Sequence, residues 1–312
     1  MFLNKEVILF VLSAFISFIL FNYVFSIYAF KFIALPNKRS SHTIPTPAGA
    51  GIVFSFVNML LSSIYSFWIP FLIFPLALIG FYDDRYGLKS IIRFIIQSIV
   101  VIISIFYIVD LSNFSFIISL LITIFLFFLG VSLINFTNFM DGIDGLIASN
   151  FLIFSFLAGI NIDSSFFSLS GSLIVFLFYN KSPAKYFMGD AGSTFLGCLL
   201  FCSLLSSETL LDGVKLILVF TTIYSDAFIC VLRRLFNKEN IFAPHKKHLY
   251  QRLCLAGWSH NKVTCLYSSL TLLMTVLYIN SSLSSMVVMS VLIMTLGLYL
   301  DKKKAIPFLK TD

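Results

Sequence analysis

Charged side chains are scarce in this sequence. Only 11% of its 312 residues are Asp, Glu, Lys or Arg, whereas about 25% is typical of a soluble domain. Hydrophobic residues make up 59%, and the mean hydropathy is +0.99. A chain with so few polar side chains cannot cover its own surface in water. These proportions exclude a soluble globule and predict an integral membrane protein.

Paired cysteines and a leader cleavage site are also missing. The five cysteines form no CxxC pair, so neither a disulfide framework nor a zinc site is indicated. The apolar run that follows Lys5 continues to Phe30 without a small-residue cleavage site. We therefore expect a retained first membrane span rather than a signal peptide.

Long apolar runs dominate what is present, and a span of the bilayer takes about 20 apolar residues. The runs lie near 7–30, 48–67, 70–82, 91–109, 115–134, 145–160, 165–180, 191–206, 214–232, 263–279 and 284–300. They predict an all-α, polytopic membrane protein with about eleven transmembrane helices. No soluble domain fits between them, so residues 1–312 are expected to form a single transmembrane domain.

The basic residues indicate the orientation, because cytoplasmic loops are enriched in Lys and Arg. With the N-terminus outside and the C-terminus cytoplasmic, nineteen of the 21 basic residues lie in the inner segments. Those segments are 31–47, 83–93, 135–145, 181–190, 233–262 and 301–312. The net charge of +7 is thus explained by topology, and no nucleic-acid partner is expected. Most of the Gly-containing loops with both acidic and basic residues also lie on this face.

The first motif is GFYDDRYGLKSIIRFIIQ, residues 80–97. Asp83 and Asp84 are adjacent at the end of an apolar run, and Arg93 follows with two other basic residues. Neighbouring carboxylates repel each other, so keeping both ionised favours a divalent cation or a cationic partner. A solvated loop with local ion pairs explains this motif equally well when it is taken alone.

The second motif is NFTNFMDGIDGLIAS. Its candidate site residues are Asn135, Asn138, Asp141, Gly142 and Asp144. The two Asn are three residues apart, as are the two Asp, so each pair shares a face if the segment is helical. The spacing does not fit an EF-hand calcium loop. A capped polar helix end is the alternative, but so many polar groups beside an apolar run favour a bound ligand.

The third motif is YNKSPAKYFMGDAGSTFLG, residues 179–197. Asp190 stands at the predicted start of a helix, where backbone amides and the helix dipole favour a phosphate. Its carboxylate suits the magnesium ion that accompanies a diphosphate. Phe187 stands beside this site, in a position to stack on a nucleobase. A helix cap with a tight turn is the alternative for this motif alone.

The fourth motif is PHKKHLYQRL, residues 244–253. An HxxH pair such as His245 and His248 can bind zinc, but two ligands are too few and the sequence offers no obvious third. The Lys and Arg residues around them fit an anionic, phosphate-bearing substrate better. An ordinary basic loop that attracts acidic lipids is the alternative.

The order of the motifs resembles the polyprenyl-phosphate N-acetylhexosamine-1-phosphate transferase family. The likeness extends from about residue 31 to 260 and is carried by PNKRSSHTIPTP, GFYDDRYGL, NFTNFMDGIDGL, FMGDAGSTFLG and PHKKHLYQRL. It is greatest to the branch that initiates O-antigen and other surface glycans. The peptidoglycan member, phospho-MurNAc-pentapeptide transferase, usually has consecutive histidines where this chain has Lys246 and Lys247 between His245 and His248.

The resemblance implies a multi-pass enzyme of the bacterial inner membrane whose active site is on the cytoplasmic face. Its substrates would be a UDP-N-acetylhexosamine and undecaprenyl phosphate, with Mg²⁺, or alternatively Mn²⁺, as cofactor. The lipid phosphate attacks the β-phosphorus and releases UMP. The family often forms homodimers, while the sugar and the oligomeric state are left open by the sequence.

The resemblance also implies roles for individual residues. Asp83 would deprotonate or orient the lipid phosphate, with Asp84 in support. Asp190 would be the main Mg²⁺ ligand, with Asp141 close to the same site. The residues implied in substrate binding are Asn135, Asn138, Gly142, Asp144, Asn180, Phe187, Arg93, His245 and His248. Two departures, Ala48 and Ala34, stand where the family commonly has Arg and Asp, and both affect sugar selectivity or efficiency more than the reaction class.

Three other readings make different predictions. A transporter would place ionisable residues near mid-span, where only Asp226 comes close. An inactive scaffold would have lost the acidic residues of the motifs. All five are present: Asp83, Asp84, Asp141, Asp144 and Asp190. A CDP-alcohol phosphotransferase would carry a DGxxAR-led signature, which is missing.

Overall fold

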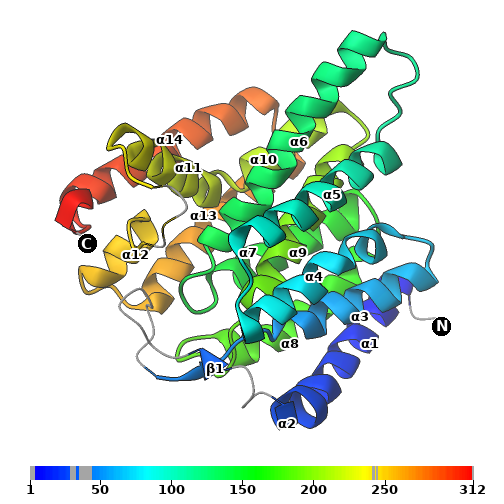
Figure 1. The fold of residues 1–312 in the computed structure, drawn as a ribbon, viewed down its shortest axis with the longest axis horizontal. Helices are drawn as coiled ribbons and strands as arrows, with labels where there is room; N and C mark the ends of the chain where they lie inside the picture. The colour runs from blue at the N-terminus through cyan, green and yellow to red at the C-terminus, as the bar shows by residue number, and fades with distance from the viewer. Residues whose placement is uncertain (1–3, 29–32, 35–43, 241–242, 244, 311–312) are drawn as a thin grey trace.

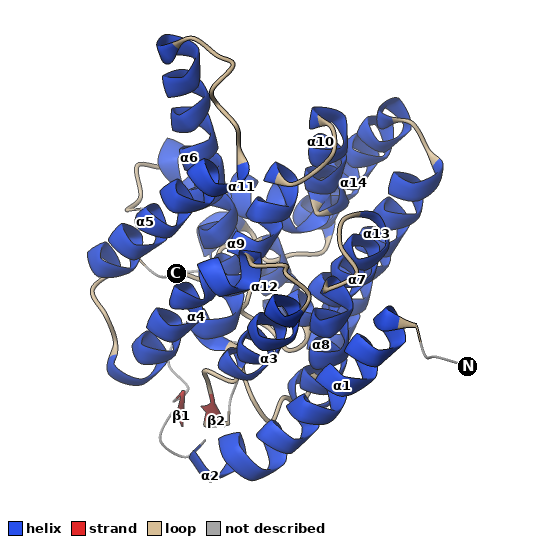
Figure 2. Cartoon of the chain, turned by 90° about the vertical axis from the view of Figure 1, so that its right-hand side faces the viewer, coloured by secondary structure: helices blue, strands red, loops and turns tan. Residues whose placement is uncertain are grey.

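The computed structural model describes residues 4–28, 33–34, 44–240, 243 and 245–310, and this part is nearly all helical (Figures 1 and 2). Most of the PNKRSSHTIPTP motif and Pro244 lie outside the described residues. The helices of ten or more residues are α1 Lys5–Ile19, α3 Gly51–Ile64, α4 Ile69–Tyr86, α5 Ser90–Ile108, α6 Phe116–Phe139, α7 Leu146–Asn161, α8 Phe166–Asn180, α9 Gly189–Leu205, α10 Leu210–Val219, α11 Thr221–Phe236, α13 His260–Asn280 and α14 Leu283–Lys303. The shorter elements are η1 Leu20–Phe25, α2 Ser26–Tyr28, β1 Ile33–Ala34, β2 Thr46–Pro47, α12 Leu249–Leu255 and η3 Phe308–Lys310.

Each apolar run of the sequence overlaps a helix, because a helix pairs backbone groups within its own segment where lipid offers no partner. The all-helical, polytopic prediction is confirmed. Five helical segments of the described part are long and apolar enough to cross a membrane, or six if the bent pair α10–α11 counts as one. Helices α3, α7, α8 and α9 are apolar but shorter. The count of eleven crossings therefore stays a prediction.

One predicted span is broken. The run 214–232 forms α10 and α11, whose axes differ by 76°. At the break the Thr221 hydroxyl donates to the Leu218 carbonyl at 2.6 Å and lies 2.9 Å from the Ser290 hydroxyl on α14. Side-chain hydroxyls that compete for helical carbonyls bend helices, so α14 and Thr221 together stabilise the corner.

Helix α9 is the centre of the molecule (Figure 1). Every residue from Ala191 to Leu204 is buried, and the helix packs against α3, α4, α5, α6 and α10. Small residues allow this close packing. A Cβ on Gly80 of α4 would collide with the backbone of Asp190 and Ala191, and one on Gly51 of α3 with the backbone of Gly192.

The connections predicted to lie on opposite membrane faces separate to opposite ends of the bundle. Figure 2 shows β1, β2 and the α4–α5 connection at the lower end, and the α5–α6 and α13–α14 turns at the upper end. The two strands pair antiparallel, with Ile33 opposite Pro47 and Ala34 opposite Thr46. This separation agrees with the predicted alternation of loops, while the assignment of the lower end to the cytoplasm stays a prediction.

We expect Gly80→Ala to lower the unfolding free energy by about 1–3 kcal/mol, because the added methyl overpacks the α4–α9 contact. Gly297→Ala on α14 is the matched control, since its Cβ would meet only Leu249 at an ordinary 3.8 Å. The control is expected to be neutral or slightly stabilising. Thermal unfolding in detergent, followed by circular dichroism, measures both. Equal midpoints for the two variants would show that the α4–α9 contact is not tight.

Candidate functional site

Arg93 joins two acidic residues from different helices. Its guanidinium lies on α5 and pairs with Asp83 at the end of α4 at 2.9 Å and with Asp190 at the start of α9. The Asp83 carboxylate also accepts a hydrogen bond from the Leu88 amide. The Arg93 side chain is 32% exposed, and those of Asp83 and Asp190 are 11% and 19% exposed. Asp83 and Asp190, which are 107 positions apart in sequence, thus form one partly accessible charged cluster with Arg93. We call this group the acidic cluster.

The neighbouring carboxylate, Asp84, binds the start of α9 itself. It accepts hydrogen bonds from the amides of Asp190 at 3.0 Å and Ala191 at 3.3 Å. Gly189 has a φ of +67°, and a side chain there would collide with the Asp84 carboxylate. The prediction that these amides receive a phosphate is therefore corrected. They already bind Asp84, which makes Asp84 a residue that positions Asp190.

Asp141 lies in the α6–α7 loop, and its side chain has no hydrogen bond or ion pair within the described part of the chain. Burial, followed by the negative charges of Asp190 and Asp144, raises the pKa of Asp141 to about 8. A carboxyl group in this setting binds a proton or a cation near neutral pH. The charge of Asp190 thus reaches Asp141, and both residues offer the oxygen ligands that a divalent cation takes. That these two residues hold a metal ion stays a prediction.

Asp144, in the same loop, is fully engaged by protein groups. Its carboxylate lies 3.2 Å from His260 Nδ1 and accepts the Ala184 amide at 3.3 Å. Burial acts to raise the pKa of Asp144, but hydrogen bonding and charge from His260, with help from Ser182 and Ala184, lower it overall. The predicted contact with uridine would have to share this carboxylate with His260. No sequence motif had pointed to His260, the first residue of α13.

The asparagines tie the motif loops together. Asn180 accepts the Gly145 amide at 3.0 Å and donates to the Tyr186 carbonyl at 2.9 Å. Asn138 accepts a hydrogen bond from the Ser193 hydroxyl on α9 at 3.1 Å. The second and third motifs are therefore in direct contact. Asn135 donates instead to Gln97 of α5 at 3.0 Å, so it belongs to the α5–α6 contact.

Backbone pairing brings a further segment to the start of α9. The Phe187 amide donates to the Pro47 carbonyl at 2.8 Å, and the Phe187 carbonyl accepts the Ala50 amide at 3.0 Å. The side chain of Phe187 is partly exposed. Ala48, which replaces the family's usual Arg, is 9% exposed. The chain from β2 to α3 thus borders the acidic cluster.

The basic loop of the fourth motif is largely neutralised. Lys247 pairs with Glu239 at 3.0 Å, and Arg252 pairs with Asp301; both cations are buried. Burial, then the charges of His248, Arg234 and Lys247, lowers the pKa of His245 to about 3. The neutral imidazole adds no positive charge for a diphosphate. The expected anion-binding surface is therefore corrected: Lys247 pairs within the connection that follows α11, and Arg252 holds α12 to α14.

His248 faces the protein interior, not the acidic cluster. Its side chain is 3% exposed and its Nδ1 lies 3.8 Å from Asp226 on α11. A buried ring leaves little surface for a soluble substrate, so the implied contact between His248 and diphosphate or sugar is not supported. His245 is partly exposed, and its substrate contact stays a prediction. Asp226 accepts three hydrogen bonds, from the Leu249 and Tyr250 amides and the Tyr267 hydroxyl, which favours a structural role.

Comparison with known proteins identifies the relatives. The sequence model of glycosyl transferase family 4 matches residues 66–208. A probable undecaprenyl-phosphate N-acetylglucosaminyl 1-phosphate transferase of Bacillus subtilis is 33% identical over 72% of this chain and 70% of its own length. An undecaprenyl-phosphate alpha-N-acetylglucosaminyl 1-phosphate transferase of Thermotoga maritima is 32% identical over 76% and 78%. The chain belongs to glycosyl transferase family 4.

The chain is also similar to proteins with another name. A phospho-N-acetylmuramoyl-pentapeptide-transferase of Caldanaerobacter subterraneus is 31% identical over 73% of this chain and 81% of its own length. The stretch matched by the family 4 model contains the acidic cluster and the two loops tied by Asn180. It ends before the fourth motif, residues 244–253, which contains His245 and His248.

We expect Asn180→Ala to lower the unfolding free energy by about 1–3 kcal/mol for each partner left unpaired, namely the Gly145 amide and the Tyr186 carbonyl. Asn161→Ala is the matched control, because Asn161 donates only to the Leu157 carbonyl of its own helix at 2.9 Å. Denaturant titration in mixed micelles compares the two variants. A loss no larger than that of the control would mean that the two loops are held together by other contacts.

Proposed function

We propose that this chain transfers an N-acetylhexosamine 1-phosphate group from a UDP-sugar to undecaprenyl phosphate or a similar polyprenyl phosphate. An oxygen of the lipid phosphate would attack the β-phosphorus, and the bond between that phosphorus and the bridging oxygen of UMP would break. UMP leaves, and the sugar stays linked to the lipid through a diphosphate. The names of the relatives from Bacillus subtilis and Thermotoga maritima supply the reaction class.

One observation carries the proposal: two acidic residues share one guanidinium, and two further acidic residues interact with one of them, Asp190. Asp83 and Asp190 bind Arg93, Asp84 binds the amide of Asp190, and Asp190 helps to raise the pKa of Asp141. If all four were ionised, Arg93 would offset only one of their charges. A surplus of this kind favours an additional cation.

The donors present fit a divalent cation such as Mg²⁺ or Mn²⁺, with Asp190 and Asp141 as the residues that would hold it. When bound, such a cation neutralises diphosphate charge and stabilises the leaving UMP. Arg93 adds a fixed positive charge beside Asp190. Asp84 keeps the Asp190 backbone in place, and Gly189 leaves room for that contact.

The nucleophile needs little activation, because a phosphate monoester is largely ionised near pH 7. Asp83, which pairs with Arg93 in the same cluster, would orient the lipid phosphate or accept its remaining proton. Phe187 and the loop of Gly142 and Asp144 would contact the nucleoside. A lipid nucleophile also accounts for a charged cluster at the ends of membrane helices. We place this end at the cytoplasmic face of the bacterial inner membrane, in a pathway of O-antigen or related surface glycans.

Asp83→Asn and Asp190→Asn are each expected to reduce turnover by at least about 100-fold, while the protein still inserts into the membrane. Asp110→Asn is the matched control, because Asp110 is exposed on the α5–α6 connection at the opposite end of the bundle. UMP release from a UDP-sugar in membranes supplied with undecaprenyl phosphate and Mg²⁺ measures all three. A near-normal rate in Asp83→Asn or Asp190→Asn would remove that residue from the proposed chemistry.

Chelation of divalent cations is expected to abolish UMP release, and Mg²⁺ or Mn²⁺ is expected to restore it, because Asp141 has no counterion among the described residues and Asp190 shares Arg93 with Asp83. The restored enzyme is then given UDP-linked N-acetylglucosamine, N-acetylgalactosamine, N-acetylquinovosamine, N-acetylfucosamine and MurNAc-pentapeptide. Activity with MurNAc-pentapeptide alone would assign the chain to peptidoglycan synthesis. Release that persists after complete chelation would contradict the cation-dependent site.

A further inference from the structure

A second cluster of metal-binding side chains lies outside the acidic cluster. Cys230 of α11 and the two histidines of the following loop, His245 and His248, place one ligand atom each within 4.8 Å of the others. The two imidazole rings are 5.0 Å apart, centre to centre. We propose that these three side chains bind a thiophilic divalent metal ion, Zn²⁺ being the best match.

The donor set selects the class of metal. Thiolate and imidazole ligands suit zinc, whereas carboxylate and carbonyl oxygens suit magnesium and calcium. Zinc bonds of about 2.0 Å to nitrogen and 2.3 Å to sulfur put neighbouring ligand atoms about 3.5 Å apart. Separations of at most 4.8 Å require only side-chain adjustment of about 1 Å. The cysteine supplies the third ligand that the HxxH spacing alone lacks.

The burial of the cluster indicates a missing partner. His248 is 2% exposed and Cys230 is 3% exposed. His248 Nδ1 is buried and has no hydrogen bond with any described residue. A buried polar atom without a partner is uncommon in folded proteins, and metal coordination of the imidazole would remove this deficiency.

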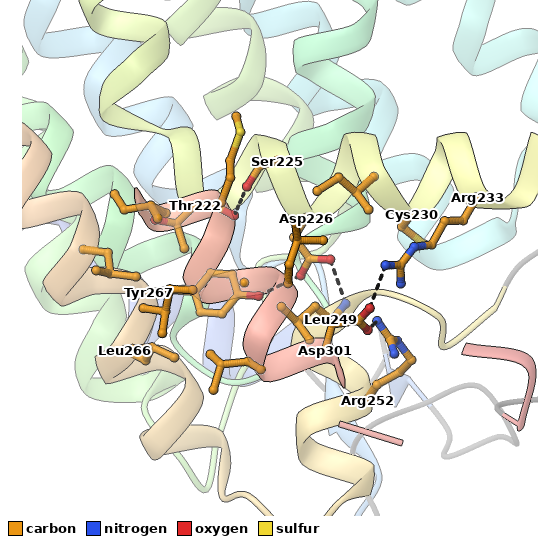
Figure 3. Close-up of a pocket in the computed structure, with 18 of the residues that line it drawn as sticks. Thr222, Ser225, Asp226, Cys230, Arg233, Leu249, Arg252, Leu266, Tyr267 and Asp301 are labelled. Atoms are coloured by element: carbon orange, nitrogen blue, oxygen red, sulfur yellow. Dashed lines mark hydrogen bonds and ion pairs between the residues drawn. The ribbon is translucent and has the colours of Figure 1, made fainter. Parts of the chain in front are cut away.

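One buried carboxylate, that of Asp226, lies beside the cluster. The Asp226 carboxylate is 3.8 Å from His248 Nδ1, close enough to offset part of the charge of a metal ion bound at that nitrogen. Asp226 and Cys230 are four residues apart and lie on the same stretch of α11 (Figure 3). Asp226 is itself fixed by the hydrogen bonds from Leu249, Tyr250 and Tyr267.

The cluster also connects to the acidic cluster. The Tyr250 ring stacks on His248 with a centre-to-centre distance of 5.7 Å, and its hydroxyl donates to the Phe139 carbonyl at 3.0 Å. A side chain on Gly142 would collide with the Tyr250 hydroxyl. A metal ion on Cys230, His245 and His248 would therefore hold in place the loop that carries Asp141. Its role would be structural, not catalytic.

The test is zinc binding by the full-length chain in detergent, with no sugar nucleotide present. The protein is stripped with a chelator, returned to excess Mg²⁺ so that the acidic cluster is saturated, and titrated with Zn²⁺. We expect one zinc per chain in the wild type, and binding more than about tenfold weaker in Cys230→Ala. Cys202→Ala is the matched control, because Cys202 is a buried cysteine of α9 that belongs to no such cluster among the described residues.

Cobalt provides a second readout that depends on the ligands themselves. Co²⁺ is expected to give a thiolate-to-metal charge-transfer band in the wild type and in Cys202→Ala, and none in Cys230→Ala. If Cys230→Ala does not fold, His245→Gln replaces it, since His245 is partly exposed, and zinc binding is expected to weaken in the same way. Equal zinc affinity in the wild type and the ligand variants, or a cobalt complex without the thiolate band, would overturn the proposal. Neither result depends on transferase activity.

Discussion

The carboxylate of Asp84 on the first amides of α9 is the contact around which the site is organised. Helix α9 is buried along almost its whole length, so its N-terminal amides need a partner within the protein. Asp84 supplies it from the end of α4 and also interacts favourably with the positive end of the helix dipole. Gly189 makes the approach possible, and Gly80 allows α4 and α9 to touch. Asp190 and Asp83 are thereby fixed next to each other, with Arg93 between them.

The other motif segments attach to the same place. The chain after β2 reaches it through the backbone of Phe187 and Ala50, and the end of α6 reaches it through the hydrogen bond from Ser193 to Asn138. Most of the polar contacts between the motif segments therefore meet at the N-terminal end of α9, although the sequence has few charged residues. Some are paired with each other: Lys247 with Glu239 inside the connection after α11, and Arg252 of α12 with Asp301 of α14. Asp141 alone among the predicted metal ligands has no protein partner in the described part of the chain.

The sequence predicts helices well here because the bilayer leaves few alternatives to a helix for a long apolar run. It also predicts which motifs carry the chemistry, because acidic and amide residues are costly beside such runs. Pairings between distant residues are not encoded in local spacing. Asp84 reaches an amide 106 positions away, His260 reaches Asp144 across 116 positions, and Cys230 joins two histidines from another segment. The corner between α10 and α11 was missed for a similar reason, since Ser290 of α14 helps to stabilise it.

Local sequence patterns also predict the binding partner of a polar or charged group wrongly. The residues around His245 were expected to attract an anion, but Lys247 and Arg252 are buried in ion pairs with acids that lie 8 and 49 positions away. Amides at the start of α9 were expected to receive a phosphate, but a carboxylate of the chain binds them. In both cases the residue type correctly indicated that the group binds an opposite charge or a polar partner. Which partner it binds depends on the three-dimensional structure. The contacts therefore refine the implied roles of Asp84, Asp144 and His248 without altering the reaction class.

Transfer of a phosphorylated sugar, rather than of the sugar alone, is tested most directly by following the β-phosphorus of the sugar nucleotide. A UDP-N-acetylhexosamine carrying radioactive phosphorus only at the β position is incubated with the protein, undecaprenyl phosphate and Mg²⁺, and the lipid and nucleotide products are separated. Attack at the β-phosphorus predicts that the label moves into the lipid and that the nucleotide product is unlabelled UMP. Label that stays in the nucleotide as UDP, with sugar in the lipid, would contradict the proposed reaction.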